Sequence, residues 1–128
     1  MRCGRVMSGS VPAGALAVAR AYHDAWQRRD YQAAWRLLGD GLTVDVPVNS
    51  YASKAAFAEA ARRTREMAAA VRPIAELGDD GQAVMLYDMT LSIGNLRVAE
   101  YFAVSGGRIT AIMHIHDTAA LRAAGAGQ

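Results

Sequence analysis

The feature that most constrains the fold is the alternation of apolar and polar residues between positions 83 and 117. The pairs Gly94-Asn95 and Gly106-Gly107 divide this stretch into three segments. Because glycine and asparagine adopt positive φ angles at low cost, each pair predicts a short turn between antiparallel strands. The stretch therefore predicts two linked β-hairpins, against which the remainder of the chain has to pack.

The first hairpin places one charged residue on an otherwise apolar face. With a two-residue turn at Gly94-Asn95, Met89 pairs with Glu100 and Tyr87 pairs with Phe102, and directly paired residues share a face. The opposite face is far more polar, because it carries Asp88, Thr90, Ser92, Arg97 and Tyr101. One apolar and one polar face are typical of an antiparallel sheet that covers a core on one side.

The second hairpin has two alternative registers, which differ in what lies beside Glu100. A two-residue loop of Gly106-Gly107 puts Glu100 next to Met113. A three-residue loop that begins at Ser105 pairs Glu100 with Ile112, and it brings to the same face Thr110, His114 and His116. The residues alone leave both registers open.

Helical periodicity precedes the hairpins in three segments, residues 13–29, 31–38 and 54–70. Asp30 and Ser53 stand before the second and the third segment, where an N-cap residue accepts a hydrogen bond from the first turn. Two shorter segments, residues 42–46 and 71–77, predict strands. Helices that come first and a strand meander that comes later predict an α+β fold, with helices packed on one face of a bent antiparallel sheet.

Length and composition set further limits. The 128 residues suit one domain, which we assign to residues 13–124, after a tail of residues 1–12 that lacks periodicity. The 14 basic residues are scattered and the net charge is only +2, so we expect no nucleic-acid partner. No apolar run reaches the roughly 18 residues that a membrane span needs, and no signal peptide is recognised. We therefore expect a cytoplasmic protein without a membrane partner, and the single cysteine, Cys3, excludes an internal disulfide.

Four segments resemble the NTF2-like superfamily, and its SnoaL-like branch most closely: AYHDAWQRRDYQAAW, LTVDVPV, AEYFAVSGGRI and HIHDTAAL. The resemblance covers residues 15–122. It implies an α+β cone in which a curved antiparallel sheet wraps around a concave pocket that helices close. Members of the superfamily include polyketide cyclases, ketosteroid isomerases, limonene epoxide hydrolases and non-catalytic binding proteins.

The resemblance to ketosteroid isomerases implies roles for two residues. Tyr22 stands at the position of their oxyanion-binding tyrosine, and Glu100 matches their protonated acid on the penultimate strand. Their general base comes just before a proline, which is Pro47 here, and this chain has Val46 at that position. The position of the base therefore differs from the isomerase pattern.

The epoxide hydrolases and the SnoaL-like cyclases have an aspartate on the last strand at the position of His114. This precedent favours the register that turns His114 inward. The epoxide hydrolases also use an arginine and a second aspartate; Leu86 occupies the arginine position, and Asp88 matches the aspartate. An enzyme of that type would therefore have an altered triad.

Together, the residues and the resemblance predict a cofactor-free acid/base enzyme of the cyclase or isomerase type that acts on a small apolar carbonyl compound. His114 would transfer a proton, since imidazole titrates near neutral pH, while Glu100 and Tyr22 would orient it or stabilise an oxyanion. The pocket walls are expected to be Trp26, Phe57, Tyr87, Met89, Phe102, Ile112 and His116. Three alternatives remain open: a non-catalytic small-molecule-binding protein, an epoxide hydrolase-like enzyme with an altered triad, and an interaction domain whose own side chains fill the cone.

For the remaining polar residues the sequence predicts positions and structural roles. Glu100, His114 and His116 match a ligand set for zinc, but the chain resembles no metal-binding branch of the family, so no metal is expected. We expect Asp88 to face outward, His23 to lie at the surface, and Asp117 to cap a C-terminal helix. If the histidines point inward, the convex side of the last strand carries an apolar row of Ile109, Ala111, Met113 and Ile115. We therefore expect the protein to form a homodimer through the convex face of the sheet.

Overall fold

The computed structural model of the protein describes residues 14–47, 50–51 and 53–117. The expected tail, the C-terminal helix after Asp117 and the limits of the domain lie outside these residues. The elements are, in chain order, α1 (Ala15–Gln27), α2 (Tyr31–Arg36), β1 (Leu38–Asp45), β2 (Ser50–Tyr51), α3 (Lys54–Met67), β3 (Ala70–Gly78), β4 (Gln82–Leu91), β5 (Gly94–Ser105) and β6 (Arg108–His116). This order confirms the expected α+β class. No helix in the described ranges is long and apolar enough to cross a lipid bilayer.

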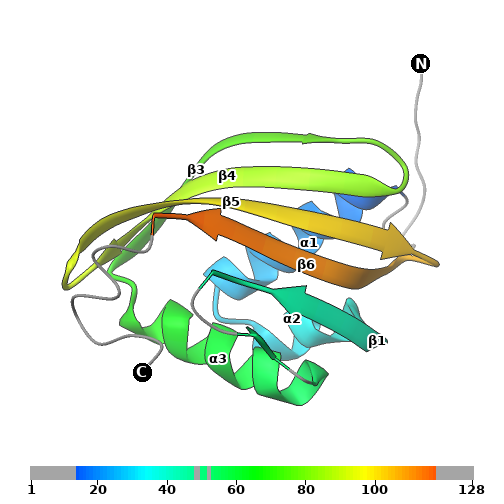
Figure 1. The fold of residues 1–128 in the computed structure, drawn as a ribbon, viewed down its shortest axis with the longest axis horizontal. Coiled ribbons are helices and arrows are strands. Elements are labelled where there is room, and N and C mark those ends of the chain that lie inside the picture. The colour runs from blue at the N-terminus through cyan, green and yellow to red at the C-terminus, as the bar shows by residue number, and fades with distance from the viewer. Residues whose placement is uncertain (1–13, 48–49, 52, 118–128) are drawn as a thin grey trace.

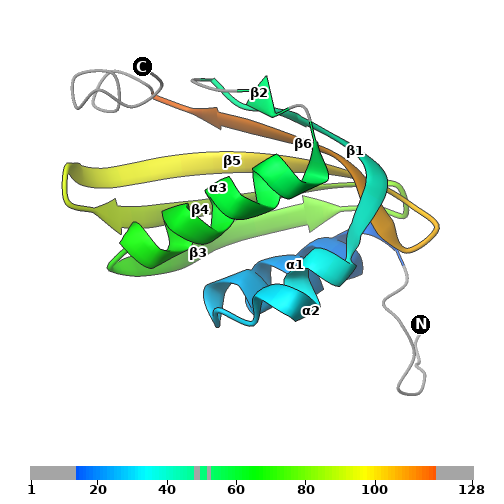
Figure 2. The ribbon, with the colours of Figure 1, turned by 90° about the horizontal axis from the view of Figure 1, so that it is seen from below.

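The six strands form one curved sheet in the order β2-β1-β6-β5-β4-β3, and the three helices lie on its concave side (Figures 1 and 2). Strands β1 and β6 are parallel, and every other neighbouring pair is antiparallel. The sheet is therefore mixed, and the expectation of a purely antiparallel sheet is wrong. A hairpin fixes the relative direction of two consecutive strands only. Strands β1 and β6 are not consecutive, because five other elements lie between them in the chain, so no hairpin predicts their relative direction.

Helices α2 and α3 begin at the predicted residues, and α1 begins at Ala15, two residues after the predicted start. Asp30 accepts a hydrogen bond from the amide three residues ahead at 3.4 Å, and Ser53 does the same at 3.1 Å. Each such cap stabilises the first turn of its helix by about 1 kcal/mol. In α1, Tyr22 and Trp26 lie on a buried stripe that packs against the concave face of the sheet.

The first hairpin turns at Ser92-Ile93 rather than at Gly94-Asn95. Neither Ser92 nor Ile93 has a positive φ, whereas Gly94, directly after the turn, has a φ of 128°. The glycine therefore forms the exit from the turn rather than its centre, a difference that the dipeptide pattern does not reveal. The observed register also sets Asp88 directly opposite Arg97, and the two form an ion pair of 2.8 Å.

The shifted turn changes the partner of Glu100 but not its face. Met85 rather than Met89 lies opposite Glu100, and the expected pair of Tyr87 with Phe102 is also absent. Both predicted pairs are therefore wrong. Because β5 is displaced by an even number of residues, each side chain keeps its predicted face, and Glu100 stays on the concave side.

The second hairpin combines features of both expected registers. Gly106 and Gly107, with φ angles of 61° and 77°, form a two-residue turn. A β-bulge at Thr110 then inserts one extra residue into β6 and changes the register by one. Beyond the bulge, His114 lies directly opposite Glu100. The three-residue loop is therefore wrong, although its expected consequence for His114 is realised by the bulge.

The bulge also changes the convex side of β6. Thr110 is exposed and donates a hydrogen bond to the carbonyl of Ala103 at 3.3 Å, so the expectation that it shares the face of Glu100 is wrong. Ile109 is buried in the core, whereas Met113 and Ile115 are 41% and 63% exposed. The expected apolar row is therefore wrong at Ile109, and its exposed members are Met113 and Ile115.

Candidate functional site

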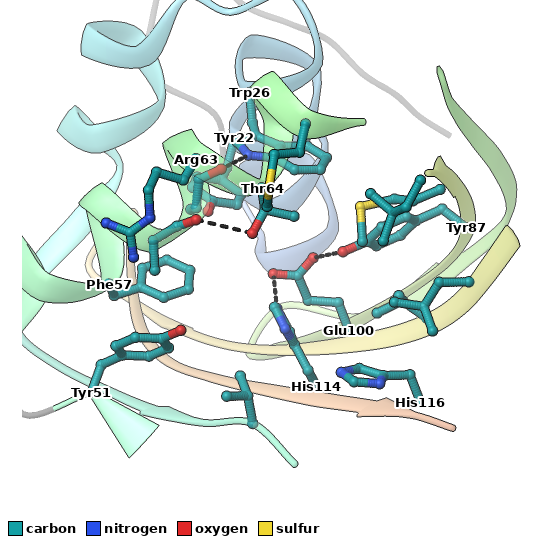
Figure 3. A pocket seen from close by; sticks show the side chains of 18 residues that line it. Tyr22, Trp26, Tyr51, Phe57, Arg63, Thr64, Tyr87, Glu100, His114 and His116 are labelled. Atoms are coloured by element: carbon teal, nitrogen blue, oxygen red, sulfur yellow. Dashed lines mark hydrogen bonds and ion pairs between the residues drawn. The ribbon is translucent and has the colours of Figure 1, made fainter. Parts of the chain in front are cut away.

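A cavity of about 350 Å³ lies between the concave face of the sheet and helices α1 and α3 (Figure 3). Small-molecule sites range from roughly 300 to 1,000 Å³, so this cavity suits a small ligand. Its walls are mainly apolar, with contributions from both helices and the sheet that include Trp26, Phe57, Met67, Met89, Leu96 and Val98. Polar side chains interrupt this lining at few places.

Glu100 is the centre of a polar cluster in the cavity wall, and it is 3% exposed. Its Oε1 accepts a hydrogen bond from the Tyr87 hydroxyl at 2.9 Å, and its Oε2 is 2.8 Å from Nε2 of His114. Nε2 of His23 lies 3.9 Å from Oε1, which is too far for a hydrogen bond. Side chains from α1, β4 and β6 therefore surround one carboxylate of β5 (Figure 3 shows the two from the sheet).

The environment keeps Glu100 ionised. Burial raises the pKa of the Glu100 carboxyl, but the charge and the hydrogen bond of His114, helped by His23 and Tyr87, outweigh burial and leave this pKa below the ordinary value for glutamate. A buried charge is stable only while such partners surround it. Glu100 therefore carries a negative charge that holds the His114 ring in place.

His114 presents one ring nitrogen to Glu100 and keeps the other free. Because an ionised carboxylate only accepts hydrogen bonds, Nε2 of His114 carries a proton. In the neutral ring the lone pair is then on Nδ1, which has no hydrogen-bond partner within the described ranges. A carboxylate that orients one nitrogen of an imidazole and leaves the other accessible is the arrangement of a general base.

Tyr22 and Tyr87 both remain protonated at neutral pH. Burial raises the pKa of each hydroxyl well above the ordinary value for tyrosine, and the charge of Glu100 raises it further. The Tyr87 hydroxyl donates to Glu100, whereas the Tyr22 hydroxyl has no hydrogen-bond partner in the part of the chain that the structure describes. Since Tyr22 also lines the cavity, its hydroxyl is available to an oxygen atom of a ligand.

Most of the side chains assigned to the site from the sequence lie at the cavity. Glu100, His114 and Tyr22 line it, and so do five of the expected wall residues: Trp26, Phe57, Tyr87, Met89 and His116. Phe102 and Ile112 do not line it, because both are buried in the core, and the ring of Phe102 lies 5.8 Å from that of Tyr22. The expectation that these two form the cavity wall is wrong: they share the face of Glu100, but at a place that is already filled.

Sequence reasoning missed His23, which was expected at the surface and is 1% exposed. Its ring packs against Tyr87 and Trp26, with centroids 4.4 Å and 5.1 Å away. Its Nδ1 is 2.9 Å from the amide nitrogen of Gln27, and its Nε2 is buried with no hydrogen-bond partner among the described residues. Ala19, His23 and Trp26 follow one another at steps of four and three residues, so the helical period would have placed His23 on the buried stripe.

Helix α3 and strand β2 supply further lining residues that the sequence did not assign to the site. Arg63 and Thr64 come from α3, and Tyr51 comes from β2, where its ring meets that of Phe57 edge-on at 6.0 Å. Arg63 is the only lysine or arginine that lines the cavity in the described ranges. The sequence carries little signal for these residues, because their place depends on where α3 crosses the sheet.

Asp88 lies on the convex side of the sheet, as expected, but it is buried beneath two arginines. Its carboxylate is 2.8 Å from Arg97 and 3.4 Å from Arg72. It does not line the cavity, so the altered triad of an epoxide hydrolase-like enzyme is not assembled there. Within the described ranges, no three histidine, cysteine, aspartate or glutamate side chains are grouped so as to hold a metal ion.

Comparison with solved structures finds the same fold in other proteins. A protein from Kribbella flavida DSM 17836 is 28% identical to this chain with a TM-score of 0.81, and the match covers 87% of this chain and 93% of that protein. An NTF2-like protein of unknown function from Cytophaga hutchinsonii ATCC 33406 is 12% identical, with a TM-score of 0.71 and coverages of 83% and 92%. A steroid delta-isomerase from Pseudomonas aeruginosa is 19% identical, with a TM-score of 0.74 and coverages of 91% and 90%. No protein-family model matches the sequence, and no curated protein matches it.

Proposed function

Because the chain has the NTF2-like fold, we propose that it is a cofactor-free acid/base enzyme of the cyclase or isomerase type, acting on a small apolar carbonyl compound bound in the cavity. One observation carries the proposal. An ionised glutamate orients an imidazole inside an apolar cavity and leaves the second imidazole nitrogen free. An imidazole held in this way can accept a proton from a ligand and return it.

The reaction begins with proton transfer to His114. Its Nδ1 accepts a proton from the carbon beside the ligand carbonyl, and the electron pair of that C–H bond moves into the carbonyl group to form an enolate. Glu100 stabilises the imidazolium through the contact of 2.8 Å, and Tyr22 donates a hydrogen bond to the enolate oxygen. Return of the proton from His114 to the γ-carbon of an enolate conjugated with a double bond completes an isomerisation. Attack of the enolate carbon on a second carbonyl group, whose oxygen takes the proton from His114, completes an aldol cyclisation.

The first prediction concerns this proton transfer, with β-tetralone and a panel of similar apolar cyclic ketones as substrates. In D₂O the protein should exchange the protons beside the carbonyl for deuterium, as followed by proton NMR. His114→Gln should slow the exchange by about 10²–10⁴-fold, because glutamine keeps an N–H group for Glu100 but has no basic nitrogen. Glu100→Gln should slow it as well, since the ring of His114 loses its charged partner.

Arg62→Gln is the matched control, because Arg62 directly precedes the lining residue Arg63 on α3 but does not itself line the cavity. It should exchange protons at the rate of the unmodified protein, and circular dichroism should show that every variant is folded. If the ketones quench tryptophan fluorescence, and so bind, while no protein exchanges their protons above the buffer rate, the chain is a non-catalytic binding protein and the enzyme proposal is refuted.

A further inference from the structure

We propose that the ligand of the cavity carries a carboxylate, which Arg63 binds, in addition to the carbonyl group next to His114. This inference rests on the proposed function and names its substrate class, an apolar keto acid. Arg63 is the only permanently charged cation among the cavity-lining residues of the described ranges. Everything else on the α3 side of the cavity is apolar or, like Thr64, uncharged.

Arg63 lies apart from the acid/base pair. It projects from α3, whereas Glu100 and His114 project from the sheet, and Figure 3 shows the Arg63 side chain on the side of Phe57 and Tyr51. The side chain of Arg63 is 60% exposed. Because Arg63 lines the cavity and its side chain is largely exposed, this side chain lies between the cavity and solvent.

The guanidinium of Arg63 is only loosely paired within the protein. Its Nη1 is 3.4 Å from Glu59, whereas Arg62 contacts the same carboxylate at 2.6 Å and 3.2 Å. Glu59 is thus satisfied by Arg62, and exposed ion pairs as long as that of Arg63 contribute little. A ligand carboxylate would compete with a weak contact and not with a tight one.

The charges in the cavity also determine how such a ligand lies. Glu100 is ionised, so a second anion beside it would be repelled, and the neutral carbonyl group of the ligand is favoured at that end. The carboxylate is then favoured at Arg63. The planar guanidinium fork matches a carboxylate with two parallel hydrogen bonds, and a single arginine suffices for one negative charge. Two anchors at separate places would hold the reacting carbon near Nδ1 of His114.

The test compares naphthylacetic acid with naphthylacetamide, two unreactive compounds of similar shape that differ in charge. Binding is measured by isothermal titration calorimetry at about neutral pH and low salt. The unmodified protein should bind the acid about tenfold more tightly than the amide, the effect of one charge-assisted hydrogen-bonded pair. Arg63→Gln should abolish this preference and leave the affinity for the amide unchanged within about twofold.

Two further variants sharpen the result. Arg36→Gln removes an equal charge from α2, outside the cavity, and leaves Glu59 paired with Arg62, so the preference for the acid should persist. Arg63→Lys keeps the charge and loses the planar fork, so it should retain part of the preference. Equal binding of the acid and the amide by the unmodified protein, or a preference that survives Arg63→Gln, would overturn the inference. Because neither compound has to react, this outcome is independent of whether His114 transfers protons.

Discussion

At the scale of single residues, His23 is the unusual member of the site. Its Nε2 is buried without a hydrogen-bond partner in the described ranges, and it lies 3.9 Å from Oε1 of Glu100. With the Gln27 amide nitrogen donating to Nδ1, the ring proton is on Nε2 and points towards a carboxylate. Burial lowers the pKa of His23; the charge of Glu100 opposes this effect, and His114 adds to it.

A second prediction follows for the pH dependence of stability. The pKa of His23 is lower in the folded protein than the ordinary value of 6.5, so on acidification the unfolded chain takes up this proton first. The stability linked to His23 is therefore complete above about pH 6.5, and it is lost as the pH falls below that value. His23→Leu lacks this proton uptake, so its unfolding free energy should fall less between about pH 7 and pH 5.

Urea denaturation of both proteins at the two pH values measures this difference. The comparison is matched, because His114, His116 and all carboxyl groups are the same in the two chains. If the unfolding free energies of the two proteins change by equal amounts, burial does not lower the pKa of His23.

At the scale of elements, the bulge in β6 decides which side chains of this strand reach the cavity. Because Thr110 is left out of the pairing with β5, His114 lies opposite Glu100. If Thr110 were paired in a regular strand, the two-residue turn would place Met113 opposite Glu100, which is one of the two registers expected from the sequence. Bulges commonly re-aim side chains in this way next to functional sites.

The third prediction is that deletion of Thr110 costs little stability. The pairs on both sides of the bulge, Val104 with Ile109 and Ala103 with Ala111, are kept, so His114 stays opposite Glu100 and only the hydrogen bond of 3.3 Å to Ala103, worth about 1 kcal/mol, is lost. His114→Ala is the contrast, because it leaves Glu100 buried without its imidazole partner, which costs about 3–5 kcal/mol of unfolding free energy. Urea denaturation followed by circular dichroism measures both. A deletion variant as unstable as His114→Ala would show that β6 does not keep its pairing with β5 once the bulge is removed.

At the scale of the whole molecule, the three helices of the described residues lie on the concave face of the sheet, and none of these helices covers the convex face (Figure 2). Large apolar side chains are exposed across that face on three strands: Leu77, Val84, Met113 and Ile115. Leu77 pairs with Val84, and Tyr101 links Val84 to Met113, so the apolar row crosses the sheet. Grouped exposed apolar residues are typical of protein–protein contacts.

The fourth prediction is a homodimer formed through this convex face. Light scattering at about 100 µM, a concentration well above typical dissociation constants of dimers, should give twice the mass of one chain. Ile115→Lys should shift the protein towards the monomer, because it buries a charge in the contact. Ile93→Lys, which changes an equally apolar exposed residue at the β4–β5 turn, should leave the dimer intact. A monomeric unmodified protein at this concentration would count against the interface.

The sequence by itself determined most of the elements and the faces of the side chains on β4 and β5, whereas β2, the start of β1 at Leu38 and the face of Thr110 were not predicted. Helical period, strand alternation and the caps at Asp30 and Ser53 are local properties, so each can be recognised from a few neighbouring residues. The face of Glu100 was predictable even with a wrong turn, because a displacement by an even number of residues preserves every face. The concave placement of Glu100 and its contact with His114 were therefore expected before the structure, although the bulge that produces the contact was not.

Only the tertiary structure decided the register of both hairpins, the parallel pairing of β1 with β6 and the limits of the cavity. The register of a hairpin depends on all the contacts between its two strands, such as the ion pair of Asp88 with Arg97. The two residues of a turn do not reveal these contacts. The cavity depends on where α1 and α3 cross the sheet. That crossing puts Phe102 and Ile112 into the core, brings Arg63 to the cavity and sets His23 against Glu100. These positions follow from packing between distant segments, which the residues of one segment alone do not specify.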